Sequence, residues 1–205
     1  MKMRNGRGAM IAAVALALSA ACSHKPPDEK GYTEAVATDR ATKDQHFRAD
    51  SDSPIPADKR ADLLPLAYFP IDPDYHVAAQ LKPTDDPTII EMVTSTGGRE
   101  RMRRGGTLEF SVRSQPLKLT AFIPADSPRR LFVPFTDLTT GTETYPGGRY
   151  LDLDRNTTGI YMIDFNRAYH PYCYYSPTWE CPYPPAENRL KIPIRAGERL
   201  KHPNT

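Results

Sequence analysis

Cysteine, tryptophan and the short motifs of well-studied enzymes are scarce or absent in this 205-residue chain, which contains three cysteines and one tryptophan. No nucleotide-binding glycine loop, metal-module spacing or catalytic-triad order occurs, so the sequence predicts no cofactor and no particular reaction. Basic charge is not in true excess. The first 21 residues carry Lys2, Arg4 and Arg7 and no acid, so the net charge of +2 becomes −1 without them, 24 basic against 25 acidic residues. Nucleic acid is therefore not an expected partner.

One long apolar run is present, near the N-terminus, and it predicts export. Met1–Gly8 is basic, Ala9–Ala21 consists of apolar and small residues, and Cys22 follows directly. We predict a secretory signal peptide over residues 1–21. As a helix, this run would rise about 20 Å, short of the roughly 30 Å of a bilayer core, which argues against a permanent transmembrane anchor.

Cys22 stands where bacterial lipoproteins are cleaved and acylated. Ser19 departs from the Leu, Val or Ile that is usual three residues earlier, so ordinary cleavage before Cys22 stays open as an alternative. Lipidation is favoured because Cys173 and Cys181 can pair with each other, which would leave Cys22 as an odd exposed thiol. Ser23 is typical of outer-membrane sorting. We therefore expect a cell-envelope protein whose partner is the membrane, through a lipid anchor at Cys22, facing the periplasm from the outer membrane in a Gram-negative host.

The remaining chain divides into a tether and one domain. Residues 22–31 are polar with two prolines, as suits a tether, and residues 32–205 form a predicted single mainly β domain. Thr33–Phe47 lacks proline and glycine and can form a helix, and Asp58–Leu64 can form one or two helical turns.

Short runs of alternating apolar and polar residues predict strands over Tyr75–Leu81, Ile89–Thr94, Thr107–Arg113, Leu117–Ile123 and Leu131–Phe135. Leu108, Phe110 and Val112 share one face of their run, as a half-buried antiparallel strand requires. Turn residues separate the runs at 97–98, 105–106, 114–116 and 126–128. This spacing predicts an antiparallel meander that forms a sandwich or a partly closed barrel, with one or two short N-terminal helices. The charged run Arg99–Arg104 could bind anions or lipid headgroups, but a solubilising hairpin tip or edge strand is the favoured interpretation.

Polar residues and long loops are dense from residue 137 to residue 198, and loops supported by a sheet are where function is usually found. Turns at Gly141 and at Gly147–Gly148 can bring Asp137, Glu143 and Arg149 together at the opening of one site. Carboxylates beside a fixed guanidinium can bind a cation, orient a sugar hydroxyl or act as acid and base. An Arg–Asp pair that only fixes a loop is an equal alternative.

The segment Tyr161–Leu190 contains six of the eleven tyrosines together with Trp179, and it adds Asp164, Asn166 and Arg189. Aromatic faces beside amide and charged groups suit a carbohydrate or another polar-edged ligand. Tyrosines and prolines that simply cover the end of a sheet are the plainer alternative.

The same segment contains His170, Cys173 and Cys181, which could ligate zinc together with a fourth residue. Their spacing matches no structural zinc module, and an oxidising envelope favours a Cys173–Cys181 disulfide, so no metal site is predicted.

Four short stretches, DFNRAY at 164–169, CP at 181–182, ENRL at 187–190 and AGE at 196–198, resemble a bacterial family known as domain of unknown function 1684. With further matching residues upstream, the likeness extends from residue 44 to residue 199 and identifies the chain as a lipoprotein member of that family. The resemblance implies a mainly β fold and carries no established activity. His170 stands where the family pattern has Asn, and Tyr172 and Tyr174 stand where smaller residues or Pro are usual. Family members without export signals also carry both cysteines, which keeps a metal role open.

Three hypotheses for function follow, and the sequence leaves open whether the protein is an enzyme. The first is a lipid-anchored envelope protein that binds a small polar ligand or glycan. Its site residues would gather at one end of the sheet: Asp137, Glu143, Arg149, Asp164, Asn166 and Arg189. The second is a hydrolase with Asp137 or Glu143 as general base, Arg149 stabilising developing negative charge, and Asp164 or His170 as orienting group or acid. The third is a purely structural envelope lipoprotein in which these residues lock loops.

Overall fold

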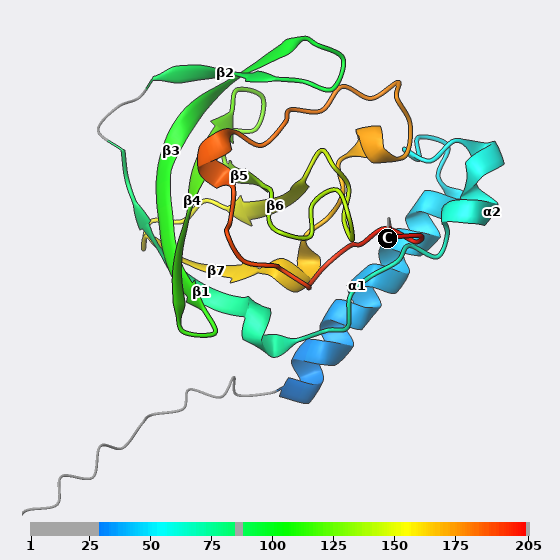
Figure 1. Ribbon diagram of the computed structural model, residues 1–205, viewed down its shortest axis with the longest axis horizontal. Coiled ribbons are helices and arrows are strands. Elements are labelled where there is room, and N and C mark those ends of the chain that lie inside the picture. The colour runs from blue at the N-terminus through cyan, green and yellow to red at the C-terminus, as the bar shows by residue number, and fades with distance from the viewer. Residues whose placement is uncertain (1–28, 85–87, 204–205) are drawn as a thin grey trace, which may run out of the picture.

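The computed structural model describes residues 29–84 and 88–203 (Figure 1). The predicted signal peptide and the predicted acylation site, Cys22, lie outside the described residues. A long helix, α1 (Glu29–Ala49), precedes the sheet and begins within the range assigned to the tether. The other helices are short: η1 (Ala57–Lys59), α2 (Arg60–Leu63), η2 (Pro73–Tyr75), η3 (Phe165–Arg167), η4 (Tyr172–Tyr174) and η5 (Ala186–Asn188), where η marks a 3-10 helix. Within these two described ranges, no helix has the length and apolar character that crossing a bilayer requires.

A single curved antiparallel sheet dominates the described part of the chain. Its strands are β1 (His76–Lys82), β2 (Ile89–Val93), β3 (Arg99–Val112), β4 (Gln115–Pro124), β5 (Arg130–Phe135), β6 (Arg149–Asp154) and β7 (Ile160–Asp164). The strand order is β6-β5-β4-β3-β1-β7, and β2 pairs with β3 beside this path. The sheet curls into a nearly closed, barrel-like form (Figure 1). The predicted mainly β, antiparallel fold is thus confirmed, in its partly closed form.

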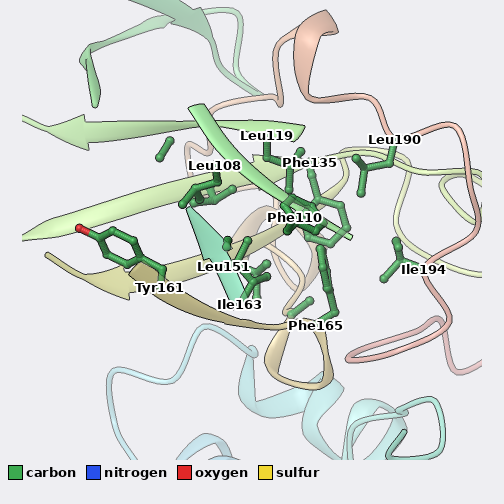
Figure 2. Close-up of a cluster of buried hydrophobic side chains, with 14 of the residues drawn as sticks. Leu108, Phe110, Leu119, Phe135, Leu151, Tyr161, Ile163, Phe165, Leu190 and Ile194 are labelled. Carbon is green, nitrogen blue, oxygen red and sulfur yellow. The ribbon is translucent and has the colours of Figure 1, made fainter. Parts of the chain in front are cut away.

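Alternate strand residues gather on one face of the sheet and form the main core (Figure 2). Leu108, Phe110 and Val112 of β3 enter it together, as predicted. The C-terminal segment also contributes, through Leu190 and Ile194. Each large apolar side chain that is fully buried contributes about 1.5 to 3 kcal/mol, so this face supplies most of the driving force for folding.

The glycine pair Gly105–Gly106, predicted as a turn, lies inside β3 instead. The pairing of β3 with β4 shifts register between Arg104 and Gly106, which is a β-bulge. Gly106 has a φ of +139°, and a Cβ atom there would lie 2.4 Å from the carbonyl oxygen of Lys82. A side chain is therefore excluded at this position. The predicted turn is wrong because paired glycines mark a bulge as readily as a turn.

The bulge reverses which face the side chains of β3 point to. Leu108, beyond the bulge, belongs to the main core, whereas Met102, before it, packs on the opposite face with Phe122 and Phe132. Without an extra residue, positions 102 and 108 would share a face. A second apolar cluster thus forms behind the main core, and Tyr150 and Cys181 complete it.

Strands β6 and β7 lie in the region predicted to be loops, and that assignment is wrong for both. β6 pairs with β5 over its whole length, and β7 pairs with β1. In β6, Leu151 and Leu153 alternate with Asp152 and Asp154, which is a strand pattern. The glycines and polar residues on either side of these short runs conceal the pattern.

Polar side chains fasten α1 to the β domain. The buried residues of this 21-residue helix are Val36 and Phe47, so its apolar stripe is narrow. Lys43 donates a hydrogen bond of 2.7 Å to Oε1 of Glu198, whose side chain is 2% exposed. Arg40 donates to the carbonyl oxygens of Phe69 and Asn166. The helix therefore depends on a few buried polar contacts with segments distant in the sequence.

Candidate functional site

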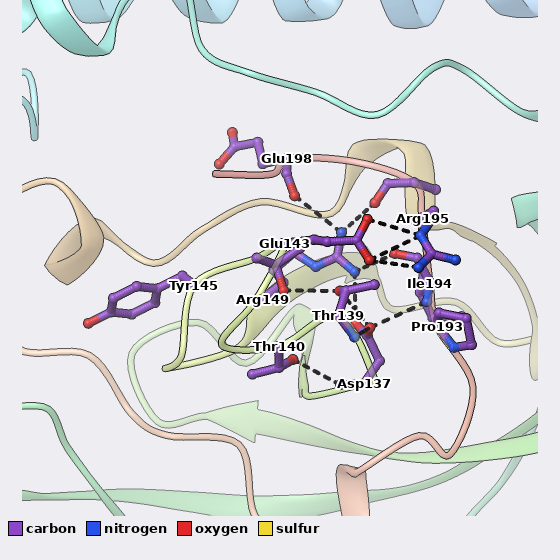
Figure 3. A network of polar contacts seen from close by, with 12 residues as sticks. Asp137, Thr139, Thr140, Glu143, Tyr145, Arg149, Pro193, Ile194, Arg195 and Glu198 are labelled. Atoms are coloured by element: carbon purple, nitrogen blue, oxygen red, sulfur yellow. Dashed lines mark hydrogen bonds and ion pairs between the residues drawn. The ribbon is translucent and has the colours of Figure 1, made fainter. Parts of the chain in front are cut away.

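Asp137 and Arg149 form an ion pair enclosed by the protein (Figure 3). Arg149 is 0% exposed, and its Nη2 donates to Oδ2 of Asp137 at 2.8 Å. The guanidinium also donates to the carbonyl oxygens of residues 194, 196 and 198. Oδ1 of Asp137 accepts from the backbone N–H and the hydroxyl of Thr139. The pair fixes the loop after β5 and the C-terminal segment to the start of β6.

Glu143 lies in the same region but makes a different pair (Figure 3). Its carboxylate accepts three hydrogen bonds from Arg195, of 2.8 to 3.1 Å, and both side chains are partly exposed. Solvent screens such a pair, which typically contributes about 0 to 1 kcal/mol. The structure thus brings Asp137, Glu143 and Arg149 into one neighbourhood but divides them between a buried ion pair and an exposed one.

Asp164 and Asn166 belong to a second network, which holds the beginning of α1. Oδ1 of Asp164 accepts from the Tyr32 hydroxyl at 2.8 Å and from the Asn166 N–H at 3.0 Å. Oδ2 accepts from Nε of Arg167 at 3.0 Å. The buried amide of Asn166 accepts from the N–H of Asp72 and donates to the Asp72 carbonyl oxygen and to the Tyr32 hydroxyl. Burial, followed by the hydrogen bond to Asp164, raises the pKa of Tyr32, so its hydroxyl stays a donor.

Arg189 lies apart from both networks. It is exposed, and its backbone forms a bridge with Thr136, whereas the neighbouring Asn188 and Leu190 are buried. The six residues predicted to form one site therefore occupy separate places. The contacts found for the acidic residues, Arg149 and Asn166 are with other parts of this chain.

A cavity of about 450 Å³ lies over the second apolar cluster, on the face of the sheet opposite to the main core. We call it the aromatic pocket. Its rings come from Phe132, Tyr150, Tyr169, Tyr172 and Trp179, and its charged groups from Lys43, Glu100, Asp126, Arg130, Asp152 and Glu180. This volume is typical of small-molecule sites. The aromatic segment predicted to bind a ligand thus supplies three of the rings, those of Tyr169, Tyr172 and Trp179.

Neighbouring strands build one wall of the aromatic pocket from alternate residues. These are Glu100 and Met102 of β3, Pro124 of β4, Arg130 and Phe132 of β5, and Tyr150 and Asp152 of β6. Because β3, β4, β5 and β6 are adjacent in the sheet, their same-face side chains align. The bulge in β3 is what places Glu100 and Met102 on this side. The opposite wall is the segment 169–182. In this segment the rings of Tyr172 and Trp179 pack edge to face, with their centroids 5.2 Å apart.

Three charged groups of the aromatic pocket, Asp152, Arg130 and Lys43, form ion pairs within the protein. Asp152 accepts from the Tyr169 hydroxyl at 2.6 Å and lies 3.4 Å from Nε of Arg130. Lys43, which pairs with Glu198, also lies over the Tyr169 ring at 4.9 Å. Burial, and then the charge of Asp152, raises the pKa of Tyr169, so its hydroxyl remains a donor to Asp152.

The pKa values of two further carboxylates of the aromatic pocket, Glu180 and Glu100, are shifted in opposite directions. Hydrogen bonds from the hydroxyls of Thr94 and Thr96 lower the pKa of Glu180. Burial, followed by the charges of Asp126 and Glu180, raises the pKa of Glu100. Opposite pKa shifts within one cavity favour a proton donor in one carboxyl group, Glu100, and an ionised carboxylate in the other, Glu180.

Cys173 and Cys181 lie next to each other as free thiols, so the predicted disulfide stays a prediction. The N–H of Cys173 donates to Sγ of Cys181 at 3.2 Å, and hydrogen bonding by the Cys181 thiol lowers the pKa of Cys173 to about 6. His170 is buried, and its Nε2 accepts from the N–H of Tyr145 at 3.3 Å. Among the residues that the structure describes, no group of three or more His, Cys, Asp and Glu side chains is arranged to hold a metal ion.

The sequence indicated three of the five rings of the aromatic pocket but none of its charged groups. Glu100 lies in the run interpreted as a solubilising edge, and Arg130 and Asp152 lie in strands with few distinguishing features. A sequence signal for these charged groups is nevertheless present. In β3, β5 and β6 a charged residue and an apolar or aromatic residue occur two positions apart and so share one face of the strand. Such a mixed face is typical neither of a buried core nor of a surface that only contacts solvent.

The described residues form a barrel-like β protein with an N-terminal helix and an aromatic surface cavity over the second apolar cluster. Residues 62–199 match the family model described as "Protein of unknown function (DUF1684)", and the chain belongs to this family. The match covers every strand of the described sheet and both walls of the aromatic pocket.

The chain is also similar to an uncharacterized protein of Haloarcula marismortui whose structure was determined by NMR in solution. The two are 39% identical, the similarity covers 85% of this chain and 98% of that chain, and the TM-score is 0.66. The likeness therefore extends beyond bacteria, to which the sequence resemblance alone pointed. No curated protein matches the chain.

Proposed function

We propose that this protein is a lipid-anchored component of the cell envelope that binds a small polar ligand or a glycan in the aromatic pocket. The observation that carries this proposal is the composition of the cavity of about 450 Å³, in which partly exposed rings face carboxylates and an arginine. Rings stack on the apolar faces of sugars and similar molecules, while fixed charges accept or donate hydrogen bonds to their polar edges.

The anchor rests on the N-terminal sequence. Cys22 follows a basic and then an apolar segment, and α1 begins seven residues later, at Glu29. Seven residues reach at most about 25 Å when fully extended. Acylation at Cys22 would therefore keep the start of α1 within about that distance of the membrane surface.

Two tyrosines provide a matched test of where the ligand binds. Tyr172 lines the aromatic pocket and Tyr183 does not, yet each is 39% exposed. We expect a thermal-shift screen of the full chain, purified in mild detergent, to find a stabilising compound among sugars, nucleotides and peptidoglycan fragments. A ligand present at 100 times its dissociation constant adds about 2.7 kcal/mol to the free energy of unfolding.

Tyr172→Ala should abolish this stabilisation, and Tyr183→Ala should leave it unchanged. A compound whose stabilising effect survives Tyr172→Ala binds elsewhere, which would refute the assignment of the pocket. If no compound stabilises the wild-type chain, the structural alternative gains support.

A hydrolase is the second candidate, and the divergent titration of Glu100 and Glu180 favours it. A carboxyl group with a raised pKa can donate a proton to a leaving group, and one with a lowered pKa stays available as a base or charge stabiliser. Chromogenic glycosides and esters provide the assay. Turnover that disappears in Glu100→Gln and persists in Glu109→Gln, an exposed residue of the same strand outside the pocket, would establish this activity.

A further inference from the structure

Negatively charged side chains outnumber positively charged ones in the lining of the aromatic pocket, with four carboxylates and two cations. Lys43 is engaged by Glu198 at 2.7 Å. Arg130 lies 3.4 Å from Asp152, which also accepts a hydrogen bond from Tyr169. Both cations of the pocket thus pair with other carboxylates, Lys43 with Glu198 and Arg130 with Asp152.

These three carboxylates face the same part of the pocket. The charges of Asp126 and Glu180 both raise the pKa of Glu100, and the charge of Arg130 has a smaller effect in the opposite direction. Across the part of the chain that the structure describes, none of the three lies within salt-bridge distance of a cation. The pocket therefore presents more negative than positive charge, and three of its carboxylates form no salt bridge with another described residue.

The carboxylate of Glu180 is positioned by the turn between β2 and β3. Its Oε1 accepts a hydrogen bond of 2.5 Å from the Thr94 hydroxyl. The same oxygen lies so close to the backbone of Gly98 that a Cβ atom at position 98 would be 2.1 Å from it. Glycine at position 98 is what permits this approach. The carboxylate is thus held against the β2–β3 turn, immediately after Trp179 in the chain.

An aromatic ring beside uncompensated carboxylates favours a cation. The negative face of a tyrosine or tryptophan ring attracts an ammonium group, and the attraction grows as water is displaced. An anionic ligand would be repelled by Glu100, Asp126 and Glu180, and a neutral ligand would leave their charges unmatched while removing their water.

We infer that the ligand of the aromatic pocket carries a cationic nitrogen, which lies between the three carboxylates and the rings of Tyr172 and Trp179. This inference rests on the proposed function, because it names the chemical class of the ligand for that same site. The ligand class is a small organic ammonium compound, of which an amino sugar is the member that also satisfies the polar groups of the pocket.

Trp179 provides a direct assay, because it is the single tryptophan of the chain and it lines the pocket. Its fluorescence can be followed while the full chain, in mild detergent, is titrated with glucosamine, glucose, N-acetylglucosamine or choline. The three sugars have similar rings, but a free ammonium group is present in glucosamine and absent from glucose and N-acetylglucosamine. Choline carries a cationic nitrogen without a sugar ring.

We expect glucosamine to bind at least about ten-fold more tightly than glucose or N-acetylglucosamine, the factor typical of a partly desolvated cation–ring contact. Glu100→Gln combined with Glu180→Gln should remove this preference without preventing the binding of N-acetylglucosamine. Glu109→Gln is the matched control, because Glu109 is exposed on the same strand outside the pocket, and it should have no effect.

The outcomes separate the two proposals. Equal affinity for the three sugars, lost in Tyr172→Ala, would overturn the inference and support the proposed function. Binding of choline with an affinity equal to that of glucosamine would support the cationic nitrogen and show that the sugar ring is not required. Failure of both glucosamine and choline to bind overturns the inference, and the wider screen with Tyr172→Ala then decides the proposed function independently.

Discussion

Arg149→Ala is expected to lower the free energy of unfolding by about 3 to 5 kcal/mol, the cost of leaving one member of a buried ion pair alone. The carboxylate of Asp137 would lose its partner at 2.8 Å in a place where its side chain is 1% exposed. Hydrogen bonds from Thr139 and from the N–H of Ile194 would still reach this carboxylate, which keeps the cost within that range. Three carbonyl oxygens of the C-terminal segment would lose their donor as well.

Urea denaturation of the full chain, followed by circular dichroism, measures this cost. Glu143→Ala is the matched control, because it breaks the neighbouring exposed pair with Arg195, and it should cost about 0 to 1 kcal/mol. Asp137→Asn combined with Arg149→Met completes the comparison. The double variant removes both charges, so it should be more stable than Arg149→Ala.

A loss below about 1 kcal/mol for Arg149→Ala would refute this reasoning, because such a value belongs to an exposed pair. It would mean that solvent reaches Asp137 and that the pair is available to a ligand, as the binding hypothesis for Asp137 and Arg149 requires. A large loss, with binding in the aromatic pocket intact under conditions where the variant is folded, would assign the pair to stability alone.

Three further predictions concern the cysteines and the buried histidine. Cys22→Ser should move the protein from the membrane fraction to the soluble fraction, and membrane retention in high salt after complete signal cleavage would contradict acylation. Mass spectrometry of a non-reduced digest of the exported protein should find the peptides of Cys173 and Cys181 linked, whereas two free thiols with bound zinc would establish the metal alternative. Burial lowers the pKa of His170 from 6.5 to about 3, so the unfolded chain gains a proton below about pH 6.5 that the folded chain does not. Stability should therefore fall as the pH decreases from 6.5 towards 3, by up to about 1.4 kcal/mol per pH unit from this group, and His170→Asn should make the fall shallower in urea titrations at successive pH values.

The sequence predicts the fold class because strand periodicity depends on local alternation that each segment carries by itself. Leu108, Phe110 and Val112 are readable in isolation, and the structure buries all three. The turn at Gly105–Gly106 could not be distinguished from a bulge, because the decision depends on Lys82, whose carbonyl oxygen approaches from another strand.

Three of the five rings of the candidate site were predictable, and its charged groups were not. Tyr169, Tyr172 and Trp179 are concentrated in one segment, so composition alone identifies them. Glu100 and Asp152 line the same pocket only because β3, β4, β5 and β6 are adjacent and because the bulge reverses one strand. Conversely, Asp137 and Arg149 are near each other in sequence whether they bind a ligand or fix a loop, and burial, which distinguishes these roles, is a property of the whole fold.

The bulge at Gly105–Gly106 also bears on how the family can diverge. Since one side of β3 stabilises the domain and the other side lines the pocket, substitutions at Glu100 can change ligand chemistry while the packing of Leu108 is inherited unchanged. Deleting a single residue at the bulge, with the core half of β3 kept in register, would turn Glu100 and Met102 towards the core face and Arg101 towards the pocket. Changes of residue type on the pocket face should therefore be common among relatives, and changes of length between Arg104 and Thr107 should be rare.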